Sequence, residues 1–84
     1  MFTRKLQLNT VDKVKTFIDL MHSYSYPADI TSGRYIVNAQ SIMGVFSLNL
    51  EKPVTIVVHC TDEQDSEAAA ELAQLCKDFI VKED

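Results

Sequence analysis

The sequence lacks the long apolar segments that direct a protein into or across a membrane. No apolar run approaches the roughly 18 residues that a membrane-spanning helix needs, and the first residues do not contain the apolar core of a signal peptide. We therefore expect a cytoplasmic protein with no membrane partner. Repeats, low-complexity stretches and linkers are also missing, and this favours a single domain over residues 1–84.

Basic residues are scarce in the second half of the chain. Residues 1–40 contain five Lys or Arg against three Asp or Glu, whereas residues 41–84 contain three against nine, so that the halves carry charges of +2 and −6. A nucleic-acid-binding domain usually presents a basic patch or stripe. We therefore expect no nucleic-acid partner.

Cysteine is rare, and the two cysteines, Cys60 and Cys76, do not have the spacing of a metal-ligand motif. Buried, reduced thiols are a more common use of such residues than a disulfide in a protein of this kind. The sequence predicts neither a metal site nor a cofactor.

Hydrophobic residues make up 46% of the chain. They recur with the periods of regular secondary structure. Alternation over about residues 2–8 predicts a strand. Spacings of three and four then indicate a helix that Asn9 or Thr10 can cap and that ends before Pro27. Its buried face is expected to comprise Val11, Val14, Phe17, Ile18 and Met21. Two short strands, residues 28–32 and 34–39, are predicted to form a hairpin at Gly33.

The second half of the chain continues this alternation of helices and strands. A short helix is predicted to begin at Ser41 and to end near Leu48. The β-branched run over residues 54–60 predicts a strand. Thr61 and Gln64 have the spacing of a capping box for the last helix. The buried stripe of that helix is expected to comprise Ala68, Leu72, Leu75 and Phe79.

This order predicts an α+β open-faced sandwich, in which helices cover one face of a four-stranded antiparallel sheet. The complete order is strand, helix, strand, strand, helix, strand and helix. A ferredoxin-like ligand-binding domain has a similar order, and periodicity alone does not separate the two. The chain has no Gly-rich or polar pocket signature that would favour a small-ligand sensor of that type.

One segment of eight residues carries a family resemblance. It reads Ser41-Ile42-Met43-Gly44-Val45-Phe46-Ser47-Leu48 and follows Asn38-Ala39-Gln40. It closely resembles the regulatory-serine segment of HPr, the histidine-containing phosphocarrier protein of the bacterial sugar phosphotransferase system. The resemblance implies the HPr fold over nearly the whole chain. It also implies that Ser41 is the target of a regulatory kinase and that the apolar residues after it bind partner proteins.

The phosphate-accepting histidine of the HPr family has no counterpart in this sequence. The family has a Gly-Ile-His-Ala-Arg-Pro-like turn at the start of its first helix, and this chain has Asn9-Thr10-Val11-Asp12-Lys13. An ungapped alignment back from Ser41 places Thr10 at the histidine position and Asp12 at the arginine position. A carboxylate has the wrong charge to hold a phosphate, and a threonine phosphate ester is a poor phosphoryl donor. We therefore predict no catalytic residue.

The two histidines of the chain do not replace the missing one. His22 lies about three turns into the predicted first helix, and His59 alternates with Val58 and Cys60, so that it is expected to face solvent. The sequence therefore favours surface or structural roles for both.

Two interpretations remain for the residues from Ser41 onward. Ser41 is either a helix N-cap alone or an N-cap that is also a phosphorylation switch. Ile42, Met43 and Phe46 are either core residues or an exposed partner-binding patch, because Val45 and Leu48 are the better candidates for the buried side.

The resemblance implies a non-catalytic protein related to the phosphoenolpyruvate-dependent sugar phosphotransferase system, with a regulatory or adaptor role. The expected partners are phosphotransferase-system components, a serine kinase or a transcription regulator. The alternative is a phosphocarrier that uses an unrecognised acceptor residue.

Overall fold

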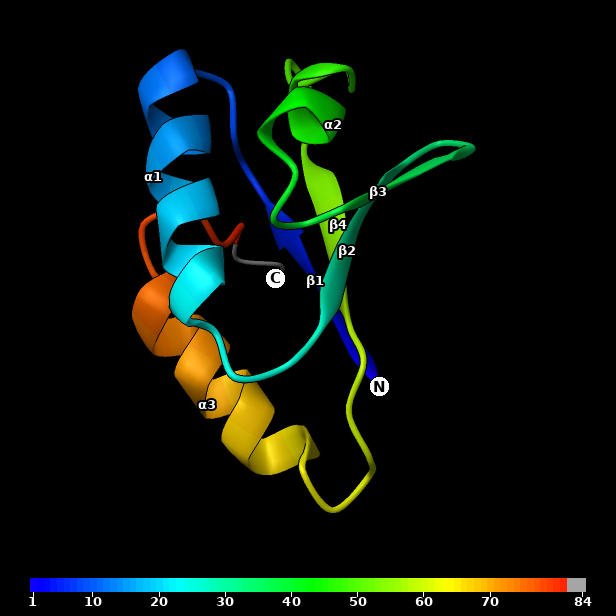
Figure 1. The fold of residues 1–84 in the computed structure, drawn as a ribbon, viewed down its shortest axis with the longest axis vertical. Helices are drawn as coiled ribbons and strands as arrows, with labels where there is room; N and C mark the ends of the chain where they lie inside the picture. The colour runs from blue at the N-terminus through cyan, green and yellow to red at the C-terminus, as the bar shows by residue number, and fades with distance from the viewer. Residues whose placement is uncertain (82–84) are drawn as a thin grey trace.

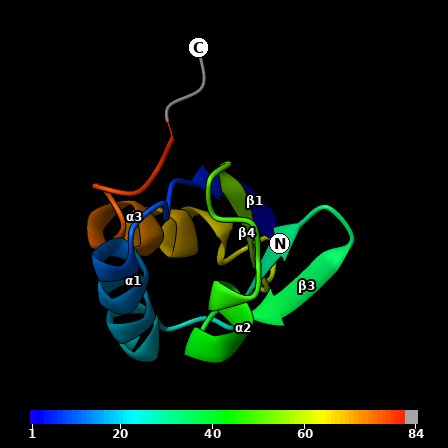
Figure 2. The ribbon, with the colours of Figure 1, turned by 90° about the horizontal axis from the view of Figure 1, so that it is seen from above.

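Four strands form one sheet, and three helices lie on one side of it (Figures 1 and 2). The structure is a computed structural model that describes residues 1–81. Its elements are β1 (Phe2–Leu6), α1 (Val11–Ser23), β2 (Ala28–Ser32), β3 (Tyr35–Asn38), α2 (Ile42–Phe46), β4 (Val54–Val58) and α3 (Asp65–Leu75). The strand order is β1-β4-β2-β3, and all neighbouring strands are antiparallel. The predicted α+β architecture is confirmed.

The sheet has one buried and one open face because its strands alternate in polarity. Val54, Ile56 and Val58 of the central strand β4 are fully buried. Cross-strand partners share a face, and Ile56 therefore lies beside the buried Ile30 of β2. The intervening residues form the opposite face, where Thr55 lies between Lys5 of β1 and Thr31 of β2.

Gly33 closes the hairpin between β2 and β3. Its φ is +59°, whereas no other described residue has a positive φ. Glycine at the first central position followed by a residue of negative φ is the pattern of a type II′ turn, whose twist matches that of the flanking strands. The turn pairs Ser32 with Tyr35 and sets the register of the hairpin.

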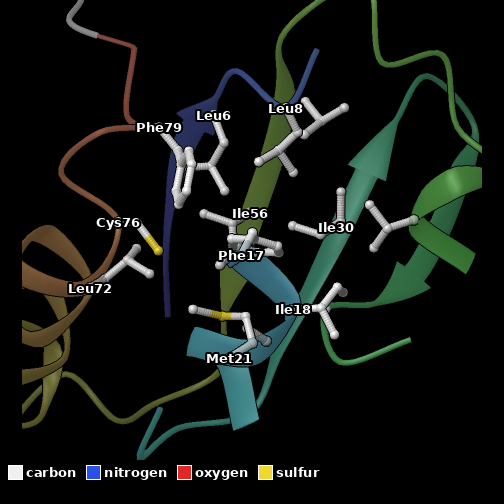
Figure 3. Packing of buried hydrophobic residues seen from close by; sticks show 14 of the residues in the cluster. Leu6, Leu8, Phe17, Ile18, Met21, Ile30, Ile56, Leu72, Cys76 and Phe79 are labelled. Atoms are coloured by element: carbon white, nitrogen blue, oxygen red, sulfur yellow. The ribbon is translucent and has the colours of Figure 1, made fainter. Parts of the chain in front are cut away.

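The core lies between the sheet and the helices (Figure 3). α1 contributes Val14, Phe17, Ile18 and Met21, and α3 contributes Ala68 and Leu72. The rings of Phe17 and Phe79 meet edge to face at 6.5 Å. At the end of α1 the Tyr24 hydroxyl donates a buried hydrogen bond of 2.7 Å to the Ala68 carbonyl, and burial raises the pKa of this tyrosine.

Several predicted boundaries were too wide. β1 ends at Leu6 and β4 at Val58, although the amides of Gln7 and His59 just beyond them still donate to the Phe79 and Pro27 carbonyls. Val11 remains 56% exposed since it lies in the first turn of α1, at the margin of the buried stripe.

The capping box before α3 is only half formed. The Gln64 side chain accepts a hydrogen bond from the Thr61 amide at 3.1 Å. The Gln64 amide, however, donates to the Thr61 carbonyl rather than to its hydroxyl, and the helix begins only at Asp65. Leu75 is only partly buried, and Phe79 lies beyond the end of α3. Phe79 reaches the core because its amide bonds to the Cys76 carbonyl in a turn that follows the helix.

The segment after α3 covers the outer edge of β1. The Gln7 amide donates to the Phe79 carbonyl at 2.7 Å, and the Val81 amide donates to the Lys5 carbonyl at 2.9 Å. Leu6 and Ile80 form an antiparallel bridge between these bonds. One edge of the sheet is therefore paired by main-chain hydrogen bonds.

Within residues 1–81, α1 and the shorter helices all lack the length and apolar character of a membrane span.

Candidate functional site

The N-terminus of α1 is the position at which the family resemblance places a phosphate acceptor. Thr10 is the N-cap, with its backbone extended at φ −134° and ψ 155°. Its hydroxyl accepts a hydrogen bond from the Lys13 amide at 3.1 Å, and its carbonyl accepts one from the Val14 amide. The Thr10 side chain therefore caps the helix, as predicted for either Asn9 or Thr10.

The side chains around Thr10 do not form an anion-binding group. Asp12 lies in the first turn, where a carboxylate is favourable for the helix dipole but repels a second anion. The Lys13 ammonium donates to the Asn9 side-chain oxygen at 3.1 Å. A phosphocarrier site needs a nucleophile with an accessible lone pair and a cation that grips the phosphate. This end of α1 offers a hydroxyl that is engaged as a cap, a carboxylate, and an ammonium that is hydrogen-bonded to Asn9.

The two histidines lie away from this position. His22 is exposed in the last turn of α1, about 18 Å along the helix from Thr10 at 1.5 Å per residue. His59 follows β4 and is 47% exposed, with its Nε2 2.8 Å from a carboxylate oxygen of Asp29 on β2. The predicted exposure of His59 is confirmed, and His22 lies away from the N-terminus of α1, as expected.

Ser41 is the N-cap of α2. Its hydroxyl accepts a hydrogen bond from the Gly44 amide at 3.1 Å, and its carbonyl accepts one from the Val45 amide. Its own amide donates to the Asn38 carbonyl. The preceding residue, Gln40, donates from its side chain to the Met21 carbonyl and so ties this turn to α1. The serine is partly exposed at the head of the helix.

α2 buries one side and exposes the other. Val45 is fully buried and Leu48 is 7% exposed, as predicted. Ile42, Met43 and Phe46 are 38%, 79% and 38% exposed, respectively. We call Ser41, Ile42, Met43 and Phe46 the α2 surface.

The first and last turns of α2 contain no charged side chain. The α2 surface is therefore apolar, with a hydroxyl at one end. α2 lies beside α1 on the helical side of the sheet (Figure 2).

Gly44 allows α2 to approach β3 closely. A Cβ at this position would lie 3.1 Å from the Cβ of Val37 on β3 and 3.0 Å from the Ser41 hydroxyl oxygen. Both distances are shorter than ordinary carbon contacts. The close backbone approach that the glycine suggests in the sequence is therefore present, and it fixes where the α2 surface lies on the sheet.

The two thiols have different environments. Cys76 is fully buried as predicted, and burial raises its pKa to about 12. Cys60 is only partly buried, so the prediction for this residue was wrong. It lies after the end of β4, where its thiol donates to the Asp65 carboxylate at 3.0 Å. Both cysteines are free thiols.

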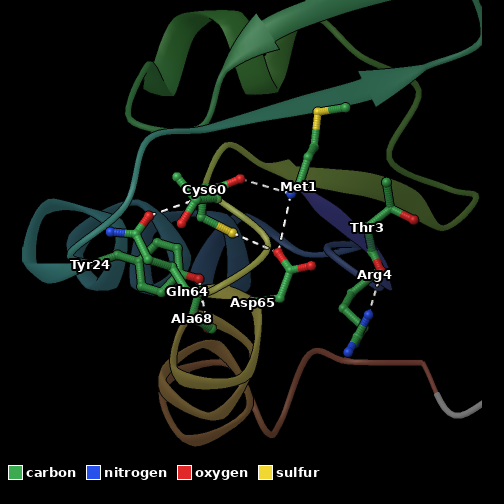
Figure 4. A network of polar contacts seen from close by, with 9 residues as sticks. Met1, Thr3, Arg4, Tyr24, Cys60, Gln64, Asp65 and Ala68 are labelled. Atoms are coloured by element: carbon green, nitrogen blue, oxygen red, sulfur yellow. Dashed lines mark hydrogen bonds and ion pairs between the residues drawn. The ribbon is translucent and has the colours of Figure 1, made fainter.

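Asp65 connects the start of α3 to β1 (Figure 4). Its carboxylate lies 3.1 Å from the Met1 ammonium, which also donates to the Cys60 carbonyl at 2.8 Å. The hydrogen bonds from the Cys60 thiol and the Met1 ammonium lower the pKa of Asp65, and the bond to Asp65 raises the pKa of Cys60. These contacts hold elements together and do not surround an open cavity.

A shallow hollow of about 280 Å³ was not predicted from the sequence. It lies between the end of α1, the start of β2 and the turn before α2, and Met21, Tyr26 and Gln40 contribute to its lining. Three separate segments form it, so no local motif could have revealed it. Among residues 1–81, no three His, Cys, Asp or Glu side chains gather as they would around a metal ion.

This fold, with an apolar short helix beside the first helix, is that of the HPr proteins. A family model described as "PTS HPr component phosphorylation site" matches residues 13–78, and the chain belongs to the HPr family. The matched region begins at Lys13 and so leaves out Thr10. No curated protein matches the sequence significantly.

Among solved structures, the chain is similar to the crystal structure of HPr-C-His from Thermoanaerobacter tengcongensis. The TM-score is 0.69 at 20% sequence identity, and the alignment covers 92% of each chain. At this identity the similarity establishes the shared fold.

Proposed function

We propose that this protein is a non-enzymatic regulatory or adaptor member of the HPr family, which binds a protein partner through the α2 surface and does not relay phosphate. The observation that carries the proposal is the contrast between the two sites. The N-cap of α1 holds Thr10 with Asp12 in the first turn, whereas Ile42, Met43 and Phe46 of α2 remain exposed.

The chemistry at Thr10 supports the first half of this proposal. A phosphocarrier must accept a phosphoryl group and release it again. A phosphoimidazole releases this group readily, whereas an alkyl phosphate ester does not. The Thr10 hydroxyl accepts a hydrogen bond from the Lys13 amide and so serves as the cap of α1. Asp12 would add electrostatic repulsion to any phosphate that arrived.

The exposure of the α2 surface supports the second half. Met43 is the most exposed large apolar side chain of the described residues, and Phe46 and Ile42 lie beside it on the same helix. Exposed apolar groups that lie together are typical of protein-binding sites, and aromatic anchors often dominate the binding energy. Partners of the kinds expected from the family are phosphotransferase-system components or a transcription regulator in the cytoplasm.

Ser41 provides a means of regulating this surface. A phosphate on its hydroxyl would add about two negative charges at the end of α2 where the Gly44 amide already donates a hydrogen bond. The helix dipole favours negative charge there, so α2 would persist while the apolar surface acquired a charged margin. A serine kinase is accordingly a proposed partner.

Phosphate relay is tested by incubating the pure protein with enzyme I of the phosphotransferase system and labelled phosphoenolpyruvate. A histidine-containing HPr serves as the positive control. We expect label on the control and none on this protein. Acid-labile, alkali-stable label on any residue of this protein would overturn the proposal. His59 is the residue to examine first in that case, because its exposed ring lies beside Asp29.

Partner binding is tested with purified phosphotransferase-system proteins and Phe46→Ala, with Tyr35→Ala as a matched control. Tyr35 is a similarly large and even more exposed aromatic residue on β3. We expect Phe46→Ala to weaken binding by more than about 1 kcal/mol and Tyr35→Ala to leave it unchanged. Ser41→Asp should keep the cap and the fold but alter the affinity. Equal effects of both aromatic substitutions, with no effect of Ser41→Asp, would exclude the α2 surface as the docking site.

A further inference from the structure

The two edges of the sheet differ in whether a further segment of main chain pairs with the edge strand. The edge of β1 is paired with residues 79–81 through main-chain hydrogen bonds. β3 is the opposite end strand, and Figure 2 shows it at the outer margin of the sheet, with no other strand of residues 1–81 beyond it. An edge that lacks a partner strand is a template for pairing with another chain.

The hydrogen-bond register shows which groups β3 presents. The Ala39 amide donates to the Ala28 carbonyl at 3.1 Å, so residues 28 and 39 form a hydrogen-bonded pair. In an antiparallel ladder such pairs alternate with non-bonded ones, and Ile30 with Val37 is the next bonded pair. Ile36 is next to Val37 on β3 and lies opposite Thr31 in a non-bonded pair. Its N–H and C=O therefore point away from β2, toward the uncovered edge.

The side chains of this edge strand favour pairing. β3 reads Tyr-Ile-Val-Asn and contains neither the charges nor the proline that usually protect a sheet edge. Tyr35 is 72% exposed and Ile36 is 69% exposed. They lie on opposite faces of the strand. Ile36 pairs with Thr31 on the open face, whereas Tyr35 lies on the same face as Val37, which pairs with Ile30.

We propose that the β3 edge pairs with the β3 edge of a second copy of this chain, antiparallel and centred on Ile36. In this register Ile36 lies opposite Ile36 of the other copy, and the two residues exchange both main-chain hydrogen bonds. Tyr35 of each copy lies opposite Val37 of the other, so that the exposed side chains on both faces are covered. The two sheets become one sheet of eight strands.

Charge complementarity favours a second copy as the occupant. The proposed register places Arg34, in the turn between β2 and β3 of one copy, beside Asn38 of the other, which lies on the open face. Asn38 is paired with Asp29, whose carboxylate also contacts His59 at 2.8 Å. Arg34 of one copy therefore lies two strands, or about 10 Å between backbones, from this carboxylate of the other. The symmetry repeats this contact and keeps the two Arg34 side chains apart. The area that one edge can bury is small, so the dimer is expected to be weak and dependent on concentration.

The register is tested by disulfide cross-linking in a Cys60→Ser background, which removes the accessible native thiol. An Ile36→Cys variant places the two thiols in a hydrogen-bonded pair with Cα atoms about 5.5 Å apart, within the range of a disulfide. Tyr35→Cys is the matched control, because it is equally exposed but lies opposite Val37 of the other copy. We expect dimer from Ile36→Cys at least tenfold faster than from Tyr35→Cys. Equal rates would overturn the register.

The association itself is tested by sedimentation of the unmodified chain over increasing protein concentration. We expect the average mass to rise above that of the monomer, Ile36→Lys to abolish the rise, and Val11→Lys to leave it unchanged. Val11 is an exposed apolar residue on α1, so this control adds the same charge away from the edge. Circular dichroism checks that both variants are folded. A monomer at every concentration, or an equal loss in both variants, would refute the proposal. The proposal would also be refuted if an added extended peptide dissociated the dimer while the Ile36→Lys substitution did not.

Discussion

Replacing Gly44 with alanine tests how tightly α2 is held against β3. Two effects oppose each other. Alanine is favoured over glycine within a helix by about 1 kcal/mol, and this would stabilise the protein. The added methyl group, however, would lie 3.1 Å from Val37 Cβ and 3.0 Å from the Ser41 hydroxyl oxygen.

The steric effect is expected to prevail. Val37 belongs to a paired strand, so its Cβ can move only if β3 shifts. The Ser41 hydroxyl can rotate away, but it then loses its hydrogen bond to the Gly44 amide, and the loss of an N-cap costs about 1 kcal/mol. Overpacking typically costs a further ~1 to 3 kcal/mol. Subtracting the gain in helix propensity leaves a net destabilisation of about 1 to 3 kcal/mol.

Urea unfolding of the wild type, Gly44→Ala, Ser41→Ala and the double variant measures this effect. The substitution at Ser41 removes one of the two close contacts, so the cost of Gly44→Ala should be smaller in that background than in the wild type. An increase in the stability of Gly44→Ala would refute the reasoning. Equal costs in both backgrounds would show that the Ser41 hydroxyl is not part of the steric conflict.

Three further predictions concern groups in and around the core. Tyr24→Phe removes the hydroxyl that donates to the Ala68 carbonyl and should lower the unfolding free energy by about 1 kcal/mol; an unchanged urea midpoint would contradict this. A thiol reagent should modify Cys60 in the native protein and Cys76 only after unfolding, since Cys76 is fully buried, and simultaneous reaction of both would contradict the assigned burial. The pKa of the Cys76 thiol is raised from 9.0 to about 12, so the unfolded chain releases this proton at lower pH than the folded one. Stability should therefore fall as pH rises above about 9, and Cys76→Ala should reduce that fall in urea titrations at pH 8 and pH 10.

The order of the elements could be predicted from the sequence because each has a strong local period. β4 shows this most clearly, since Val54, Ile56 and Val58 are buried and the residues between them are not. The boundaries were less predictable, as the end of β1 at Leu6 shows. Leu8 is fully buried like a strand residue, but burial in a loop and burial in a strand leave the same apolar signal in a sequence.

The chemistry of the candidate site was also determined largely by the sequence. The absence of a histidine near Thr10 and the hydroxyl of Ser41 before an apolar run are properties of residue identity, which no packing can alter. The capping roles of both residues follow from short-range geometry, and the structure confirms them at hydrogen-bond distances of 3.1 Å.

Only the tertiary structure decided which apolar residues are exposed. Periodicity placed Val11 with the buried stripe of α1, and it did not decide whether Ile42 and Phe46 belong to the core or to the surface. A helix pattern shows which residues share a face, but it does not show how far a neighbouring element covers that face. The same is true of the sheet edges. Residues 79–81 pair with β1, which lies at the opposite end of the sequence, and this pairing leaves β3 as the other edge of the sheet. Contacts between residues distant in the chain depend on the packing of entire elements, so no local pattern in the sequence records them.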